Sequence, residues 1–350
     1  MQPTNDPLLV YLPPFPSQHA ASSPLLPSFL HKHPVATINY RWSPFSQPEV
    51  GEKTGSTPLH WPTPVHDTSF AFAWLLESLP PPTRGRRDIY VFGSYLGAGL
   101  AASLALTEAH SHSRFGVRGF IGHNGIYNWT MFLPDHRINK VPRRSKSALP
   151  PPGPAEGSHI HHLQERMPAL FDKPENLFDP FASPSLFFHS PGLIVPQSFF
   201  MTVEHSALID NMTSDDEIPP IAIKAPRKSH LVYPPRQSTL KVPDALLLFD
   251  SAPITETKSS ARTKGGRLAR RARASGNSFE TQAAELAELM RRSVNVVELK
   301  DRSRWDDDLD MQAVEAAKRI QVVSAGFEGQ STDLSEGGKD AVASWLECRR

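Results

Sequence analysis

A short apolar strand that runs through a glycine-rich turn into an alanine-rich helix constrains this chain more than any other feature. Residues 88–92 form an apolar run, residues 93–99 contain three glycines, and residues 100–109 continue with alanine and leucine. A strand followed directly by a helix packs that helix back onto its own sheet, so the next strand runs parallel to the first. The apolar run at 115–121 is expected to be that strand.

The same alternation of short apolar runs and amphipathic stretches occurs on both sides of this unit. We predict an α/β fold, with a mostly parallel central sheet and helices on both faces. The other strands are expected at 8–12, 34–40, 244–249 and 294–299. The other helices are expected at 64–79, 278–292, 309–323 and 338–348.

The middle of the chain differs in composition from its two ends. Between 124 and 240 the periodicity is weak, but proline, histidine and bulky aromatic residues are frequent, which favours a folded insertion over a disordered segment. We therefore predict a core formed by residues 1–123 and 241–350, with a cap-like insertion at 124–240. An arginine-rich stretch at 255–277 is expected to be a mobile basic loop.

Bulk properties exclude several classes of protein. The formal net charge is +1, which gives no reason to expect a nucleic-acid partner. The one cysteine, Cys348, cannot form an intrachain disulfide or a cysteine-based metal site. No apolar run reaches membrane-spanning length, and the N-terminus lacks the pattern of a signal peptide. A cytoplasmic protein without a cofactor is the expectation.

Several phrases, in this order, resemble the hormone-sensitive-lipase-like esterase branch of the α/β-hydrolase superfamily. They are residues 39–44, His66-Asp67 with 73–75, the strand, turn and helix at 91–101, and 242–248. The resemblance covers about 7–122 and 240–348, and it implies that the insertion is the family's cap. The family's first strands have no counterpart, which indicates either a sheet trimmed to about six strands or an incomplete gene model.

The resemblance makes the glycine-rich turn the place of the catalytic nucleophile. In the G-x-S-x-G elbow the serine stands at a strained corner between strand and helix, and the glycines remove side chains that would clash there. Gly93 and Gly97 occupy the glycine positions, but the residue at the nucleophile position is Tyr95. Ser94 comes one place too early. The corner is therefore expected to be kept and the nucleophile lost.

The other parts that an esterase needs are also altered. The oxyanion loop would fall at residues 13–15, where two prolines lack the N–H groups that such a loop provides. The acid would fall near Pro253, and the nearest carboxylate is Asp250. The base would be a histidine after the last strand, but the last histidine of the chain is His230. The resemblance thus implies a hydrolase relative without a complete triad.

Two residues near the corner allow an active alternative. Tyr95 could itself act as an unusual nucleophile if a base lay within hydrogen-bonding distance, although we expect its ring to fill the vacated pocket and its hydroxyl to find a partner. His123 ends the fourth expected strand and could line a pocket or replace the base, or it could be an ordinary polar residue at a strand end. Ser94, His123 and Asp250 form the candidate relocated triad.

Two further groups of residues are candidates for binding sites. His159, His161 and His162 could ligate a metal ion, but no carboxylate or cysteine completes a recognised spacing, and we favour a solvated loop and no metal. The basic loop could contact nucleic acid, but it lacks interleaved aromatic residues, and we favour a solvated segment.

The sequence therefore predicts a catalytically inactive pseudo-hydrolase of the lipase and esterase type. It would bind a small apolar ligand between sheet and cap, or a protein partner. The alternative is an active carboxylic ester hydrolase with relocated catalytic residues.

Overall fold

A computed structural model describes the chain in nine stretches. These are residues 6–16, 25–42, 59–79, 86–139, 153–193, 228–251, 276–299, 309–329 and 331–349. The basic loop predicted at 255–277 lies outside the described residues except for its last two positions.

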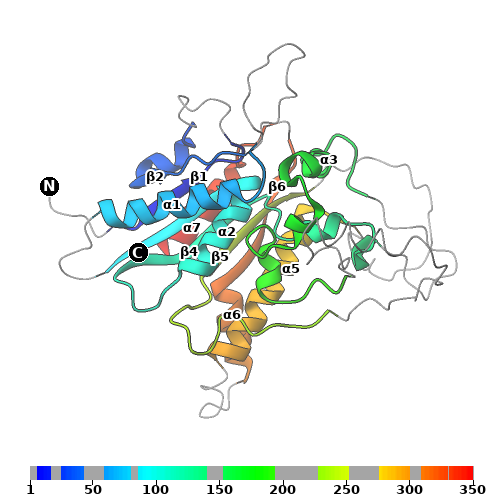
Figure 1. The fold of residues 1–350 in the computed structure, drawn as a ribbon. Helices are drawn as coiled ribbons and strands as arrows, with labels where there is room; N and C mark the ends of the chain where they lie inside the picture. The colour runs from blue at the N-terminus through cyan, green and yellow to red at the C-terminus, as the bar shows by residue number, and fades with distance from the viewer. Residues whose placement is uncertain are drawn as a thin grey trace, which may run out of the picture.

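The described residues form a six-stranded, all-parallel sheet in the order β2-β1-β3-β4-β5-β6 (Figure 1). This confirms the predicted fold class and the expected number of strands. The strands are β1 (Leu8–Leu12), β2 (Val35–Thr37), β3 (Arg87–Ser94), β4 (Phe115–His123), β5 (Asp244–Ser251) and β6 (Ile320–Phe327).

Helices cover both faces of this sheet because its central strands are apolar on both sides. One face packs against α1 (Thr63–Ser78), α2 (Leu96–Glu108) and α5 (Phe279–Ser293), and the other face packs against α7 (Glu336–Glu347). Along β3, Val91 points into the first layer and Phe92 into the second, as the alternation of a strand requires. Figure 1 shows α1 and α2 in front of the sheet and α7 behind it.

Local sequence explains where these helices begin. Pro64 lies in the first turn of α1, where the missing N–H costs nothing. Ser278 and Thr281 form a reciprocal capping box at the start of α5. The first half of α2 is nearly all alanine, glycine and leucine, and this helix is buried from Leu96 to Leu106. Small side chains let it lie close against the sheet.

The predicted last strand at 294–299 is wrong. Val294–Glu298 continue α5 as a π-helical turn, and the sixth strand is β6, at the end of a segment predicted to be helical to residue 323. Both segments are short runs of β-branched residues, which periodicity alone cannot assign to strand or helix. The helix before β6 is α6 (Leu309–Arg319), so only the first part of that prediction is helical.

The described part of the segment between β4 and β5 is built mainly from short helices. They are η2 (Trp129–Phe132), η3 (Arg137–Asn139), α3 (His159–Phe171), η4 (Pro174–Phe178) and η5 (Pro184–Phe187), while η1 (Ser28–Lys32) lies outside it. Trp42 and Trp61 of the core pack against Phe171 of α3, with ring centroids 5.5 and 5.7 Å away. These buried aromatic contacts hold the C-terminal end of α3 against the segments that follow β2 and precede α1.

The chain reverses its direction of travel across the sheet at β1. It passes from β1 to β2 on one side and then returns to β3 on the other side. In open parallel sheets, the carboxyl ends of the two strands at such a switch point flank the usual ligand site. Here that place lies between Leu12, the last residue of β1, and Tyr95, the residue that follows β3.

Candidate functional site

The corner between β3 and α2 keeps the geometry of a nucleophile elbow. Tyr95 has φ 49° and ψ −114°, a backbone conformation that is strained for a residue other than glycine. Its N–H donates to the carbonyl of His123 at 2.8 Å, which ties the corner to β4. A Cβ on Gly93 would lie 2.3 Å from the carbonyl oxygen of Gly97, and a Cβ on Gly97 would lie 2.3 Å from that of Pro13. The corner therefore requires both glycines.

The side chain of Tyr95 fills the space where a serine hydroxyl would face substrate. It is 1% exposed, and the ring of Phe15 stacks on it with centroids 5.5 Å apart. Its hydroxyl accepts a hydrogen bond from Asn124 Nδ2 at 3.2 Å and lies 2.9 Å from His159 Nδ1. Burial raises the pKa of Tyr95 far above its ordinary value, so the phenol stays neutral at physiological pH.

His123 and Asp250 meet at the carboxyl ends of β4 and β5. His123 Nε2 lies 3.0 Å from Asp250 Oδ2, and the histidine side chain is fully buried. Asn124 donates to the same carboxylate oxygen at 2.7 Å and accepts from the backbone N–H of Asp250 at 2.8 Å. Burial on its own would raise the pKa of Asp250, but the hydrogen bonds from His123 and Asn124 hold it below its usual range.

Ser94 lies beside His123 in the sheet, since these two residues are register partners on β3 and β4. The histidine ring is nevertheless bonded to Asp250 through Nε2, and its Nδ1 has no hydrogen-bond partner within the described ranges. The structure thus brings the three candidates Ser94, His123 and Asp250 to one end of the sheet. It does not place a serine hydroxyl on the imidazole, which a triad requires.

Two acid–base residues of the site were missed or misjudged from the sequence. The segment around His159 was expected to be a solvated loop, but His159 is the first residue of α3. The helix begins there because the Ser158 side chain caps it by accepting a hydrogen bond from the N–H of His161. Glu328 follows β6, and its Oε1 accepts from the backbone N–H of His159 at 2.5 Å and lies 3.3 Å from His159 Nδ1. Misplacing the last strand hid Glu328, which follows the true one.

One backbone donor that an oxyanion hole requires is already used inside the chain. In the elbow arrangement, one donor is the N–H of the residue after the nucleophile. That residue is Leu96, and its N–H donates to the carbonyl of Pro14 at 3.2 Å. The preceding carbonyl, of Pro13, accepts from the hydroxyl of Tyr40 at 2.9 Å. A substrate oxygen would have to break a hydrogen bond of the fold to reach the donor of Leu96.

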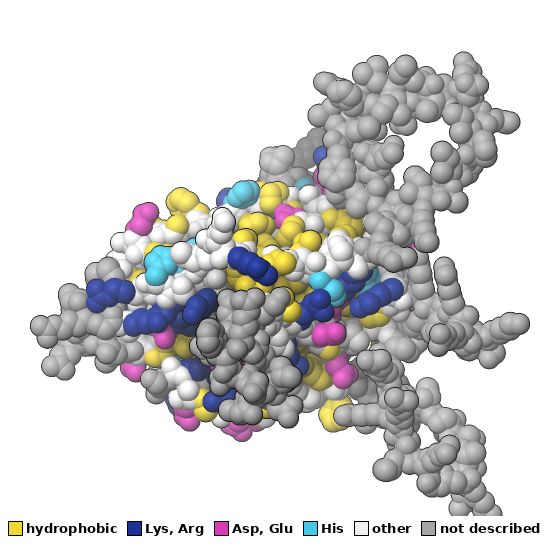
Figure 2. All heavy atoms as spheres, turned by 90° about the horizontal axis from the view of Figure 1, so that it is seen from below, with side chains coloured by type: hydrophobic (Ala, Val, Ile, Leu, Met, Phe, Trp, Pro, Cys, Tyr) yellow, Lys and Arg dark blue, Asp and Glu magenta, His cyan; other side chains and the backbone are white. Residues whose placement is uncertain are grey.

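Figure 2 shows one face of the molecule, on which the described lysine and arginine side chains lie among apolar, histidine and acidic ones. No described helix combines the length and the apolar character that crossing a membrane requires. Among the described residues, one group of three side chains has the spacing of metal ligands: His161, His162 and Glu165 of α3.

Comparisons with known proteins return esterases at low similarity. No protein-family profile matches the sequence, and no curated protein matches it. Among solved structures, an esterase from the archaeon Pyrobaculum calidifontis aligns over 98% of this chain and 74% of its own length, with 14% identity and a TM-score of 0.42. A hormone-sensitive lipase from a metagenome library aligns over 98% of this chain and 78% of its own length, with 12% identity and a TM-score of 0.43.

A third solved structure comes from a fungus. Carboxyl esterase 2 from Tuber melanosporum aligns over 90% of this chain and 79% of its own length, with 11% identity and a TM-score of 0.37. The fold class of this chain rests on its own parallel sheet and on the corner at Tyr95.

Proposed function

We propose that this protein is a hydrolase relative that has lost ester hydrolysis and acts by binding a protein partner. The observation that carries the proposal is the state of the elbow. Its nucleophile position holds a buried, neutral tyrosine, and the N–H of Leu96 is bonded to the carbonyl of Pro14. An acyl transfer needs a nucleophile that reaches substrate and a free donor for the oxyanion.

Filling of the corner favours a protein partner over a small apolar ligand. Phe15 and Phe279 pack on the ring of Tyr95, so the described side chains occupy the space beneath the first turn of α3. Large apolar groups are instead presented outward on α1, where Phe70 is 77% exposed and Trp74, one turn later, is 61% exposed. Exposed aromatic side chains of this kind are enriched at protein interfaces. The alternative to a protein partner is a small apolar ligand bound between the sheet and the proposed cap.

The cytoplasm is the compartment that suits this role. Cys348 is exposed and free in the structure. A free thiol persists in a reducing compartment, whereas oxidising compartments favour disulfides. The domain organisation that we propose is the one expected from sequence, with a core of 1–123 and 241–350 and a cap at 124–240.

The competing function is ester hydrolysis with relocated residues, and one observation favours it. His159 Nδ1 lies 2.9 Å from the hydroxyl of Tyr95 and 3.3 Å from Glu328, which brings a nucleophile, a base and an acid together. The same nitrogen faces both partners, however. It cannot accept the proton of Tyr95 while it donates its own proton to Glu328, so the relay of a triad does not form.

Labelling of the full chain with a fluorophosphonate, followed by intact mass and peptide mapping, tests the proposal. We expect no adduct on the wild-type protein, while an active serine esterase labelled in parallel reacts. We also expect no adduct on Tyr95→Ser, because Leu96 and Pro14 still close the oxyanion position, and Tyr95→Ala serves as the variant without a hydroxyl. An adduct on Ser94 or Tyr95 of the wild-type protein would refute the proposal that the protein has lost ester hydrolysis, and it would identify the nucleophile.

A further inference from the structure

The first turns of α3 carry three metal-type ligands on one side of the helix. His162 Nδ1 lies 3.3 Å from Glu165 Oε2, and His161 Nδ1 lies 3.7 Å from the same oxygen. The three ligand atoms all lie within 4.8 Å of one another. The sequence did not reveal the carboxylate, because its partnership depends on α3 being a helix, which places residues three and four apart side by side.

We propose that His161, His162 and Glu165 bind one divalent transition-metal ion of the zinc type. Zinc bonds to nitrogen and oxygen ligands are about 2.0–2.1 Å long, so the ligand atoms of a tetrahedral site stand roughly 3.3–3.5 Å apart. The separation of His162 from Glu165, 3.3 Å, falls in that range, and that of His161 from Glu165, 3.7 Å, needs a shift of a few tenths of an ångström. The ligand atoms of His161 and His162 lie within 4.8 Å of each other, so they need the larger adjustment. Rotation of exposed side chains provides such a shift.

The hydrogen bonding of His161 points to a missing ligand. Its Nδ1 is shielded from solvent and has no hydrogen-bond partner in the part of the chain that the structure describes. A buried polar atom without a partner is costly, and an ion placed between this nitrogen and Glu165 would satisfy it. The backbone N–H of His161 is occupied by the cap at Ser158, so the turn that presents the ring is held in place.

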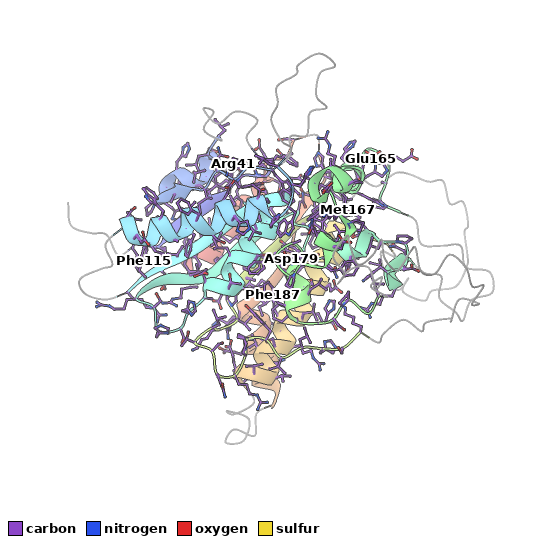
Figure 3. The ribbon with its side chains drawn as sticks, viewed as in Figure 1. Arg41, Phe115, Glu165, Met167, Asp179 and Phe187 are labelled. Carbon is purple, nitrogen blue, oxygen red and sulfur yellow. The ribbon has the colours of Figure 1, made fainter. Side chains whose placement is uncertain are left out.

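Two of the three ligands are open to an ion from solution. The side chain of His162 is 54% exposed and that of Glu165 is 59% exposed. Figure 3 shows Glu165 directed away from the body of the protein and Met167, on the opposite side of α3, directed toward the core. Three protein ligands leave at least one coordination position for water or for a group from a partner.

The donor set selects among metal ions. Two imidazole nitrogens and one carboxylate oxygen suit zinc and its neighbours in the transition series, whereas magnesium and calcium prefer oxygen ligands. The N-terminal end of a helix carries a positive partial charge that opposes a cation. The full negative charge of Glu165, one turn later, outweighs that partial charge at the position of the ion.

An ion at this position would act on the candidate site. His159, in the same helical turn, contacts both Tyr95 and Glu328. Linking His161 to Glu165 through a metal would hold that turn in its helical form. We therefore expect zinc to stabilise the contact between α3 and the core as well as the helix itself.

Zinc titration of the full-length protein against a chromophoric chelator tests the site. We expect one equivalent of Zn²⁺ to bind, with affinity falling at least about tenfold in Glu165→Gln and in His161→Gln, as loss of a ligand requires. Mg²⁺ should not compete, and binding should weaken at acidic pH because protons compete for the imidazoles. Zinc should also raise the melting temperature of the wild-type protein but not that of Glu165→Gln.

The matched control is the second pair of neighbouring histidines. His110 and His112 have ring centroids 5.9 Å apart, but within the described residues no third ligand joins them at metal-site spacing. His112→Gln should leave zinc affinity unchanged. Equal zinc binding by wild-type protein and Glu165→Gln, or equal loss in His112→Gln, would overturn the proposal. Chemical modification of the wild-type histidines adds a measurement without variants: zinc must protect His161 and His162 from diethyl pyrocarbonate.

Discussion

Replacement of Gly97 by alanine tests whether the corner at Tyr95 is as tightly packed as the structure indicates. The added Cβ would lie 2.3 Å from the carbonyl oxygen of Pro13 and 2.6 Å from that of Leu12. Both contacts are with backbone at the end of β1, so no side chain can rotate away. The first turn of α2 would have to move off the strand, and the hydrogen bond from Leu96 to Pro14 would be lost with it.

The expected cost follows from three contributions. Overpacking against rigid neighbours costs about 1–3 kcal/mol, and loss of the backbone hydrogen bond costs about 1 kcal/mol more. The higher helix propensity of alanine returns about 1 kcal/mol. The last two contributions cancel, so we expect Gly97→Ala to lower the free energy of unfolding by about 1–3 kcal/mol, which is the steric contribution. Urea unfolding followed by circular dichroism measures this loss as a lower midpoint.

Gly337 provides the matched control, because it is the second residue of α7 as Gly97 is the second residue of α2. The nearest atom to a Cβ on Gly337 would be the carbonyl oxygen of Ala325, at 3.8 Å, which is an ordinary contact. Gly337→Ala should therefore stabilise the protein by up to about 1 kcal/mol through helix propensity alone. If the two variants have the same unfolding midpoint, the close approach of α2 to β1 is refuted.

The remaining predictions concern buried polar contacts. Glu285 is paired with Lys228 at 2.8 Å. Burial alone would raise the pKa of Glu285, but the charge of Lys228 and the hydrogen bonds from Lys228 and Asn128 hold that pKa well below its usual range. The ionised carboxylate of Glu285 therefore stabilises the fold above its unfolded pKa of 4.5, and this stabilisation is lost as the pH falls below that value. Glu285→Gln should lower the free energy of unfolding by about 2 kcal/mol at pH 7, less than for a fully buried pair because Lys228 reaches solvent. The difference from the wild-type protein should shrink when unfolding is measured at pH 3. Equal stability of the two proteins at pH 7, or an unchanged difference at pH 3, would contradict this prediction. Glu336→Gln, in an exposed pair, should change stability too little to measure. Tyr95→Phe should lower the free energy of unfolding by about 1 kcal/mol and speed hydrogen exchange in the first turn of α3. Unchanged exchange there would show that the Tyr95 hydroxyl does not hold this turn in place.

The parts of the fold that could be predicted are those determined by neighbours in sequence. The strand at 115–121 and the helix at 278–292 were located from periodicity and capping residues, and both occur with ends shifted by a residue or two. The segments 294–298 and 320–327 could not be told apart, since both are short and rich in β-branched residues. Their difference is tertiary: the second pairs with β5, whereas the first continues α5.

The candidate site was harder to predict because its contacts span long distances in sequence. The strained corner and its two glycines follow from a local motif, and the position of Tyr95 follows from that motif as well. The meeting of Tyr95 with His159, 64 residues later, and of His159 with Glu328, 169 residues later, depends on how the segment between β4 and β5 folds against the sheet. No pattern in the sequence encodes that placement.

The strained corner at Tyr95 has a physical explanation in the contacts of that residue. A positive φ at a non-glycine residue costs about 1–3 kcal/mol and persists only where surrounding structure enforces it. Here the backbone N–H of Tyr95 is bonded to His123, and its hydroxyl is bonded to Asn124 and contacts His159. A smaller residue would keep the first bond and lose the others, together with the stacking of Phe15. The corner that presents a nucleophile in an esterase therefore serves in this chain to fasten α3 to the end of β3, and its strain is offset by contacts that only a long, polar-tipped aromatic side chain can make.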